Sequence, residues 1–223
     1  MTLVLLDAET PVFPNPNSAA KEPDGLLAVG GNLSPNTILA AYSKGIFPWF
    51  NEQDPILWWS PSVRCVIHPA KIHSSKSLKK HIRNHQFTIT IDKGFNQVIQ
   101  ACAERGNNQE TWITDDMMDA YTRLHRLGHA HSLEVWEDKQ LIGGIYGLAI
   151  GGIFCGESMF SRATNGSKIA MLYLCQHLVA KGFELLDCQL VNKHLLTMGG
   201  QAIKRTDFLS KLAKLREKKV NWN

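Results

Sequence analysis

The centre of the chain, residues 132–156, reads SLEVWEDKQLIGGIYGLAIGGIFCG and contains the pattern that decides the fold. Two apolar stretches, 132–136 and 140–149, flank the polar residues 137–139, as in a β-hairpin. A glycine pair at 151 and 152 then precedes a third apolar stretch, residues 153–156. This region therefore predicts three consecutive strands that pair as an antiparallel meander.

The segments after the meander alternate between helix and strand patterns. Residues 167–181 place apolar side chains on one face of a helix, which ends before Gly182, and the apolar run 183–188 predicts a buried strand. A meander, a helix and a further strand resemble the central part of a GNAT-like acyltransferase fold, although a fold alone does not identify a reaction. We predict a mixed α+β (α/β) class, with a GNAT-like domain whose central, mostly antiparallel sheet is flanked by helices.

The first 62 residues have a different composition from the rest of the chain. They are rich in Pro, Gly and aromatic residues, and a short helix is expected after Ser34-Pro35, where Ser is a good N-cap and Pro a good first helical residue. We predict a small turn-rich N-terminal domain, residues 1–62, and a GNAT-like catalytic domain, residues 63–223. The clustered Trp and Phe of the first domain are expected mainly to pack in its core or between the domains.

Composition limits the class of protein. The chain has 223 residues, of which 44% are hydrophobic, so it can bury a substantial core. No run approaches the roughly 18 apolar residues that span a bilayer, and no basic leader precedes an apolar run. The five cysteines are odd in number and form no Cys-x-x-Cys pair, which favours thiols in a reducing compartment. We expect a cytoplasmic protein that does not engage a membrane, and a monomer.

Positive charge is concentrated in two segments. Residues 55–91 contain six Lys and Arg and no acid, and residues 204–219 contain seven basic residues against two acids. These segments carry +6 and +5, which leaves −7 for the remainder of a chain whose net charge is +4. Such clustering is typical of a polyanion-binding surface, and equally of a solvated basic face.

Two carboxylates interrupt apolar runs. Glu157 lies in FCGESMFSR, residues 154–162, and Asp187 lies in DCQ, residues 187–189. A carboxylate in an apolar setting is costly unless it has a partner or a chemical role. The two acids therefore indicate a functional site.

Several strings resemble the leucyl/phenylalanyl-tRNA-protein transferase family. They occur in order from about residue 13 to residue 208. The strings are GLLAVGGNL (25–33), GIFPW (45–49), WWSP (58–61), TWIT (111–114), HAHS (129–132), GGIYG (143–147), GESMF (156–160) and DCQ (187–189).

This resemblance implies an enzyme that moves leucine or phenylalanine, and less well methionine, from aminoacyl-tRNA to the N-terminal Arg or Lys of an acceptor protein, which marks the acceptor for N-end rule degradation. The expected partners are leucyl-tRNA, phenylalanyl-tRNA and such acceptor proteins. No metal, nucleotide or coenzyme is expected. The His81 and His85 pair lacks further ligands at suitable spacing, so we do not read it as a metal site.

The resemblance also assigns roles to residues. Asp187 and Gln189 are expected to orient and deprotonate the acceptor amine, with Glu157 near the aminoacyl end. Trp112 resembles the family tryptophan that packs on the aminoacyl-adenosine end. The expected aminoacyl pocket comprises Trp112, Ile145, Phe154, Ser158, Met159, Leu174 and Leu186. The acid-free basic segment itself predicts a basic helix over residues 76–84. The expected tRNA-binding residues are Arg64 and four residues of this helix, Lys76, Lys79, Lys80 and Arg83.

Two other classes remain open from the residues alone. An acetyl-CoA-dependent N-acetyltransferase would need a glycine-paired pyrophosphate loop before the central helix, and residues 162–167 offer one glycine. A non-catalytic RNA-binding protein would account for the basic segments but would leave Glu157 and Asp187 without a role.

Overall fold

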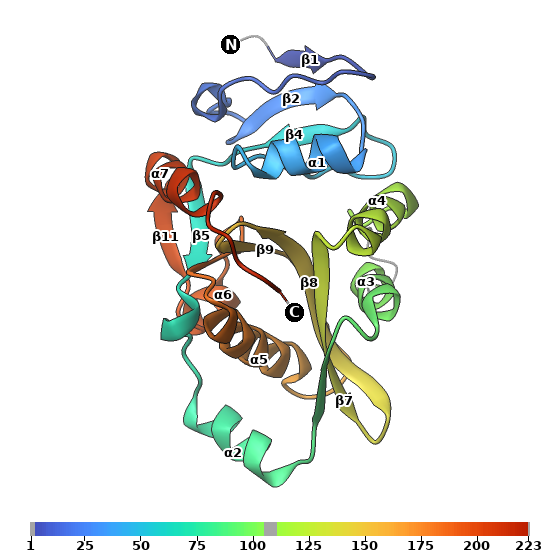
Figure 1. Ribbon diagram of the computed structural model, residues 1–223, viewed down its shortest axis with the longest axis vertical. Coiled ribbons are helices and arrows are strands. Elements are labelled where there is room, and N and C mark those ends of the chain that lie inside the picture. Colours follow the sequence, from blue (N-terminus) through green and yellow to red (C-terminus); the bar gives the residue numbers. More distant parts are fainter. Residues whose placement is uncertain (1–2, 105–110, 223) are drawn as a thin grey trace.

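The part of the chain that the structure describes forms two sheets, one above the other in Figure 1, with most of the helices arranged around the larger sheet. The computed structural model describes residues 3–104 and 111–222. Within these residues, no helix is both long and apolar enough to cross a membrane.

The smaller sheet is formed by the N-terminal part of the chain and has the strand order β1-β2-β4-β3. Its strands are β1 (Val4–Leu6), β2 (Leu26–Gly30), β3 (Phe47–Pro48) and β4 (Leu57–Trp59). Helix α1 (Pro35–Tyr42) begins as the sequence predicts, because the Ser34 side chain accepts a hydrogen bond from the amide of Thr37 and Pro35 occupies the first turn. The structure thus places Tyr42 at the end of α1, where it faces the larger sheet.

The larger sheet has seven strands in the order β11-β5-β10-β9-β8-β7-β6. Its strands are β5 (Val63–Ile67), β6 (Thr88–Ile91), β7 (Ala130–Glu137), β8 (Gln140–Ile150), β9 (Ile153–Ser161), β10 (Leu185–Asp187) and β11 (Gln201–Lys204). Every neighbouring pair is antiparallel except β9 and β10, which are parallel. The predicted meander is β7-β8-β9, and the predicted mixed class with a mostly antiparallel sheet is confirmed.

Helices cover both faces of this sheet (Figure 1). The helices are α2 (Lys76–Asn84), α3 (Phe95–Ala103), α4 (Asp115–Arg126), α5 (Gly166–Lys181), α6 (Lys193–Thr197) and α7 (Arg205–Leu215). Alternation along the strands produces two cores: Tyr146 and Cys155 pack with α3 and α4, whereas Ile145 and Phe154 pack with α5. The chain crosses from β9 to the parallel strand β10 through α5, which is the order of elements expected for a GNAT-like domain.

The structure differs from the sequence prediction mainly at strand ends. Strand β9 continues to Ser161 rather than ending near residue 156, and β10 ends at Asp187. Strands β5 and β11 and helix α6 were not predicted, because each is short and has no clear apolar periodicity of its own. The boundary between the two sheets falls between β4 and β5, and we propose that the domains divide near residue 62.

Candidate active site

The two central strands separate where β10 ends. Leu186 and Asp187 are paired with Phe154 and Cys155 of β9, but beyond Asp187 the chain no longer follows β9. Gln189 adopts a left-handed backbone conformation with φ 52°, which ends the extended strand. Strand β9 continues, paired only with β8, so a gap opens between its second half and the segment after Asp187.

A bulge in β9 directs Glu157 into this gap. Tyr146 pairs with Ser158 and Gly147 pairs with Gly156, so Glu157 is the extra residue between them. Glycine is required at position 147, because a Cβ atom there would lie 2.1 Å from the carbonyl oxygen of Cys155. The close approach of β8 thus supports the bulge that orients Glu157.

Glu157 lies at the centre of a hydrogen-bond network. Its Oε2 accepts bonds from the hydroxyls of Tyr42 at 2.7 Å and Tyr121 at 2.9 Å, and these hydroxyls lie 2.7 Å apart. Its Oε1 accepts a bond from Nε2 of Gln189 at 3.2 Å. Burial raises the pKa of the Glu157 carboxyl to about 7, although the two tyrosine hydrogen bonds act to lower it. Glu157 can therefore change its charge near neutral pH.

Asp187 forms a buried ion pair with Arg64. Nε and Nη2 of Arg64 donate to Oδ1 and Oδ2 of Asp187 at 2.8 and 2.7 Å, and both side chains are fully buried. The Arg64 guanidinium also packs over the rings of Phe47 and Phe208, at 4.8 and 4.5 Å from their centroids. Burial acts to lower the pKa of Arg64, but the charge and hydrogen bonds of Asp187 outweigh burial and raise it. Arg64 is thus held as a cation.

A cavity of about 380 Å³ occupies the gap. The N-terminal part of the chain lines it with Phe47, Pro48 and Trp49, and the part of the chain after β5 supplies the remaining residues. Those residues are Trp112, Ile145, Gly156, Glu157, Ser158, Met159, Met171, Leu186, Cys188, Gln189, Leu190, Asn192 and Leu195. The cavity is therefore mostly apolar, with Glu157 and Gln189 as linked polar groups, and its size is typical of a small-molecule site.

Five of the seven residues expected in the aminoacyl pocket line this cavity: Trp112, Ile145, Ser158, Met159 and Leu186. Phe154 and Leu174 do not, and their assignment is corrected. Both are fully buried in the core beneath α5, and Phe154 stacks on Trp222 with ring centroids 5.1 Å apart. The point at which β9 and β10 separate decides whether an apolar residue near the acids lines the cavity or packs in the core. The sequence does not show where that point lies.

The expected polar residues also separate. Glu157 and Gln189 line the cavity, whereas Asp187 does not and is fully buried, which corrects the expectation that Asp187 faces the acceptor amine. Asp187 and Gln189 do not share a strand face, because β10 ends at Asp187. Instead the backbone amide of Gln189 donates to Oδ1 of Asp187 at 3.0 Å. Arg64 was expected to bind tRNA, and this is also corrected, since a side chain buried against Asp187 cannot reach a phosphate.

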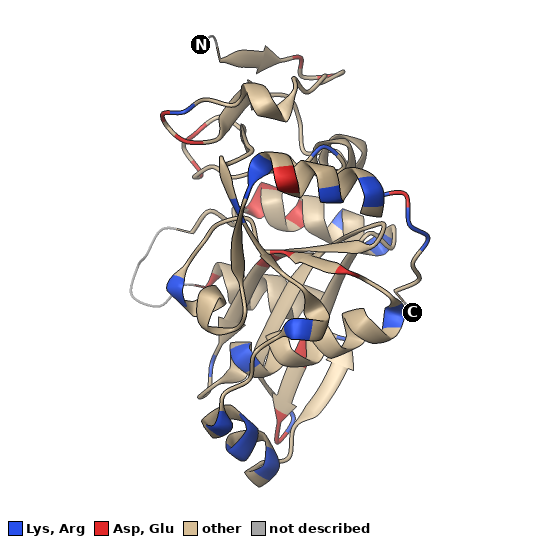
Figure 2. Cartoon of the chain, turned by 90° about the vertical axis from the view of Figure 1, so that its left-hand side faces the viewer, with Lys and Arg blue, Asp and Glu red and all other residues tan. Residues whose placement is uncertain are grey.

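The other expected tRNA-binding residues lie on α2. Lys76, Lys79, Lys80 and Arg83 are all exposed on this helix, which the sequence predicted with the same bounds. Figure 2 shows α2 as a basic projection without acidic residues, at the end of the molecule opposite the N-terminal sheet. The surface is available to a polyanion.

Sequence reasoning missed several residues of the site. Tyr42 and Tyr121 come from α1 and α4, and they meet at Glu157 through contacts between residues 36 to 115 positions apart. Trp49 was expected to pack inside the N-terminal domain or between domains, but it lines the cavity and is 40% exposed. The string GIFPW, which contains Trp49, was the available signal.

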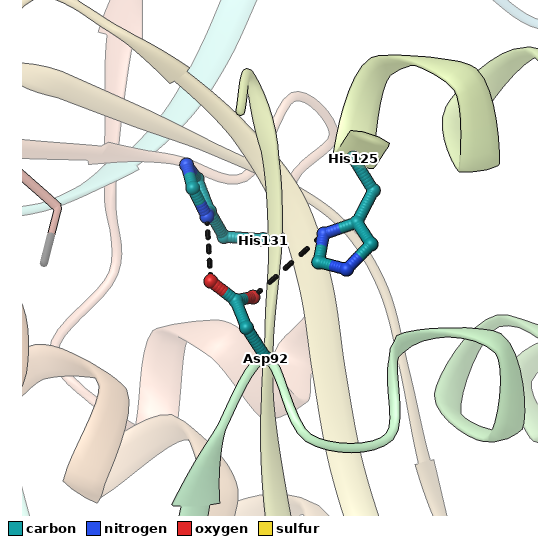
Figure 3. A group of neighbouring side chains, drawn as sticks. All are labelled: Asp92, His125 and His131. Atoms are coloured by element: carbon teal, nitrogen blue, oxygen red, sulfur yellow. Dashed lines mark hydrogen bonds and ion pairs between the residues drawn. The ribbon is translucent and has the colours of Figure 1, made fainter. Parts of the chain in front are cut away.

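A second polar cluster consists of Asp92, His125 and His131 (Figure 3). Their ligand atoms lie within 4.8 Å of one another, a spacing that a metal ion requires. However, Asp92 Oδ2 already accepts bonds from His131 Nδ1 at 2.8 Å and Trp222 Nε1 at 2.9 Å, while His125 Nδ1 lies 2.8 Å from the Ala130 carbonyl oxygen. The cluster thus matches its own donors and acceptors and anchors Trp222 near the end of the chain.

Comparison with known proteins adds a family. A model of the leucyl/phenylalanyl-tRNA protein transferase family matches residues 66–213, and one of its N-terminal domain matches residues 31–62. Leucyl/phenylalanyl-tRNA–protein transferases of Shewanella piezotolerans and Shewanella halifaxensis are each 53% identical over 221 residues, covering 99% of this chain and 94% of each relative.

Solved structures show a more distant likeness. A GCN5-related N-acetyltransferase from Kribbella flavida is 10% identical, with a TM-score of 0.39, over 75% of this chain and 60% of that protein. L-PGS from Bacillus licheniformis is also 10% identical, with a TM-score of 0.41, over 74% and 53% of the two chains.

Proposed function

The chain belongs to the leucyl/phenylalanyl-tRNA protein transferase family, and we propose that the cavity between β9 and the segment after β10 is where its transfer reaction takes place. The activity of the family is transfer of leucine or phenylalanine from an aminoacyl-tRNA to a protein. We propose that the acceptor is the α-amine of an N-terminal Arg or Lys, that methionine is a weaker donor, and that the product enters N-end rule degradation. The observation that carries the site is an apolar cavity whose polar groups are a linked carboxylate and amide.

The apolar wall of the cavity suits the donor side chain. Ile145, Met159, Met171, Leu186 and Leu195 lie on this wall, and flexible Met side chains can accommodate both leucine and phenylalanine. An apolar pocket distinguishes one methylene by only about 1–3 kcal/mol, so selectivity between these donors should be modest. Trp49 and Trp112 provide flat surfaces at the same cavity for the terminal adenosine of the tRNA.

Gln189 is placed to orient the acceptor amine. Its Nε2 donates to Glu157, so its Oε1 is left to accept a hydrogen bond from an amine in the cavity. The reaction needs little catalysis beyond this orientation of the amine, because the donor ester is already activated and an α-ammonium with a reference pKa near 8 loses its proton readily. The amine nitrogen attacks the ester carbonyl, the amide bond forms, and the tRNA hydroxyl leaves. Holding both partners together can supply most of the acceleration.

We assign Asp187 a positioning role in place of direct contact with the amine. Oδ1 of Asp187 accepts a hydrogen bond from the backbone amide of Gln189, and Arg64 neutralises the charge of Asp187. Glu157 supports Gln189 from the other side and faces the donor aminoacyl group. The substrate itself can accept the proton released by the amine, through the departing tRNA oxygen.

The basic helix α2 fits the tRNA. A shallow groove between α2 and α5 is lined by Lys76, Lys79 and Arg83 together with Tyr173, which combines cations with a stacking surface. A phosphate backbone that continues from the cavity along α5 would meet this groove.

The test is transfer by the purified full chain from radiolabelled leucyl-tRNA to a peptide that begins with Arg. Peptides that begin with Lys should accept, whereas a peptide that begins with Glu and an N-acetylated Arg peptide should not. Acetyl-CoA in place of leucyl-tRNA should give no product. Product from acetyl-CoA, or equal transfer to the Glu peptide, would overturn the proposal.

A pair of glutamine variants tests the site itself. Gln189→Ala should lower kcat, because it removes the oriented amide, while Gln140→Ala, an exposed residue at the start of β8, should not. Equal rates for these two variants would remove Gln189 from the reaction.

A further inference from the structure

Cys65 of β5 and Cys188, the residue that follows β10, lie side by side next to the cavity. In the antiparallel pairing of β5 and β10, Leu186 faces Ile67 and Asp187 faces Val66. The next step of this register brings Cys188 to Cys65, and the Cys188 amide donates to the Cys65 carbonyl at 2.9 Å. The Cys65 amide donates to the Gln189 carbonyl and not to that of Cys188, so the two cysteines are adjacent without forming a regular hydrogen-bonded pair. Adjacent residues of antiparallel chains have Cα atoms about 4.5–5.5 Å apart, which lies within the range that a disulfide bridges.

The two thiols are in contact and only one can be reached. Cys188 is partly exposed and lines the cavity, whereas Cys65 is fully buried behind it. A hydrogen bond from the Cys188 thiol lowers the pKa of Cys65, although burial acts to raise it. The same hydrogen bond and burial raise the pKa of Cys188 well above its usual value. A thiolate of this pair therefore lies on Cys65, where the Cys188 thiol donates a hydrogen bond to it.

We propose that Cys65 and Cys188 form a redox-active dithiol, which a peroxide entering the cavity converts to a disulfide and a thiol reductant restores. The inference rests on the proposed function for its effect on activity, but the formation of the bond does not depend on that function.

The chemistry balances with a peroxide as the oxidant. The Cys65 thiolate takes the proton of Cys188 as the Cys188 sulfur attacks a peroxide oxygen, so that Cys188 becomes a sulfenic acid and the hydroxide that leaves is protonated by solvent to water. The Cys65 sulfur then loses its proton and attacks the sulfur of Cys188, and hydroxide leaves and is protonated to water. In total two thiols and one hydrogen peroxide give one disulfide and two waters.

Closure of the disulfide would act on the site through Gln189. Cys188 is the residue between Asp187 and Gln189, and the Gln189 carbonyl also accepts a bond from the Cys65 amide at 3.0 Å. Drawing the Cys188 sulfur toward Cys65 moves a side chain of the cavity wall and shifts the adjacent Gln189, whose backbone is already in a left-handed conformation. A displacement of about 1 Å at an active site can cost roughly a hundredfold in rate.

The experiment treats the purified full-length protein with one equivalent of hydrogen peroxide and divides each sample in two. One half is alkylated, digested without reduction and examined by mass spectrometry for a peptide pair linked through Cys65 and Cys188. The other half is assayed for leucine transfer before and after dithiothreitol.

We expect the linked pair, a fall in kcat of roughly ten- to a hundredfold, and recovery with dithiothreitol. Cys65→Ala should form no link and lose the recoverable part of the inhibition. Cys175→Ala, a matched change of a fully buried cysteine on α5 whose thiol pKa burial raises to about 12, should behave like the unmodified protein.

Absence of the linked pair after peroxide treatment, or recoverable inhibition of the same size in Cys65→Ala, would overturn the inference. If the protein transfers no leucine at all, the proposed function fails, while the linked pair still tests the dithiol.

Discussion

Arg64 and Asp187 form a bidentate ion pair inside the protein, with their nitrogen and oxygen atoms 2.7 and 2.8 Å apart. Both charges are removed from solvent, and the pair lies directly behind Gln189. The main energetic consequence of such an ion pair is the cost of losing one partner, because the other charge is then left buried without a counter-charge.

Replacing Arg64 should therefore destabilise the fold strongly. Arg64→Met leaves the Asp187 carboxylate uncompensated, and we expect a loss of about 3–5 kcal/mol in the free energy of unfolding. The matched change Arg162→Met breaks an ion pair with Glu104 in which both side chains are half exposed, and it should cost less than about 1 kcal/mol. Urea unfolding of both variants measures the difference, and equal losses would contradict the assignment.

Glu157 should make stability and activity depend on pH near neutrality. The fold raises the pKa of this carboxyl from 4.5 to about 7, so the folded state holds the proton more tightly than the unfolded chain does. The stabilising contribution is full below pH 4.5 and is lost as pH rises to about 7, by up to about 3 kcal/mol. Glu157→Gln should remove this dependence.

The measurement for Glu157 is the free energy of unfolding between pH 5 and pH 8, together with kcat/KM over the same range. If the unmodified protein and Glu157→Gln show parallel curves of unfolding free energy against pH, the Glu157 carboxyl does not titrate between pH 5 and pH 8. A loss confined to the affinity for leucyl-tRNA would argue that Glu157 positions the donor and takes no direct part in the chemistry.

Tyr121→Phe should shift the midpoint of the pH profile of kcat/KM to higher pH. The change removes one of the two tyrosine hydrogen bonds that lower the pKa of Glu157, so the carboxyl should titrate at a higher pH. Tyr146→Phe is the matched control, because the Tyr146 hydroxyl is buried and has no hydrogen-bond partner among the residues that the structure describes. Profiles of kcat/KM against pH for the two variants should separate, and identical midpoints would rule out the proposed tuning.

Charge reversal on α2 should weaken tRNA binding. Lys79→Glu removes one cation and adds one anion on the basic helix, so binding of leucyl-tRNA should weaken and its dependence on salt should flatten. Lys21→Glu makes the same change at an exposed site in the N-terminal domain and should have a smaller effect. A salt titration of Kd for each variant checks this, and unchanged slopes for Lys79→Glu would exclude α2 from the tRNA path.

Helix positions were the part of the fold most accessible from sequence. The bounds of α2 agree with the prediction and those of α5 differ from it by one residue, because helix end signals and apolar spacing lie within each segment. Strand β10 was predicted over residues 183–188, which is too long, because the apolar residues Phe183 and Cys188 lie outside the strand and a left-handed turn follows at Gln189. The cavity between β9 and the segment after β10 depends on that turn, so the residues that line it were only partly predictable.

The sequence by itself determined the meander, the helix that follows it, the basic helix α2, the family, and the two carboxylates that mark the site. These depend on periodicity, on end signals and on unusual strings, all of which are local in the chain. Only the tertiary structure decided that Arg64 is buried while the lysines of α2 are exposed, that Glu157 is held by Tyr42 and Tyr121, and that Asp187 lies behind Gln189. The physical reason is that burial and pairing are set by contacts between residues far apart in sequence, which a local pattern does not contain.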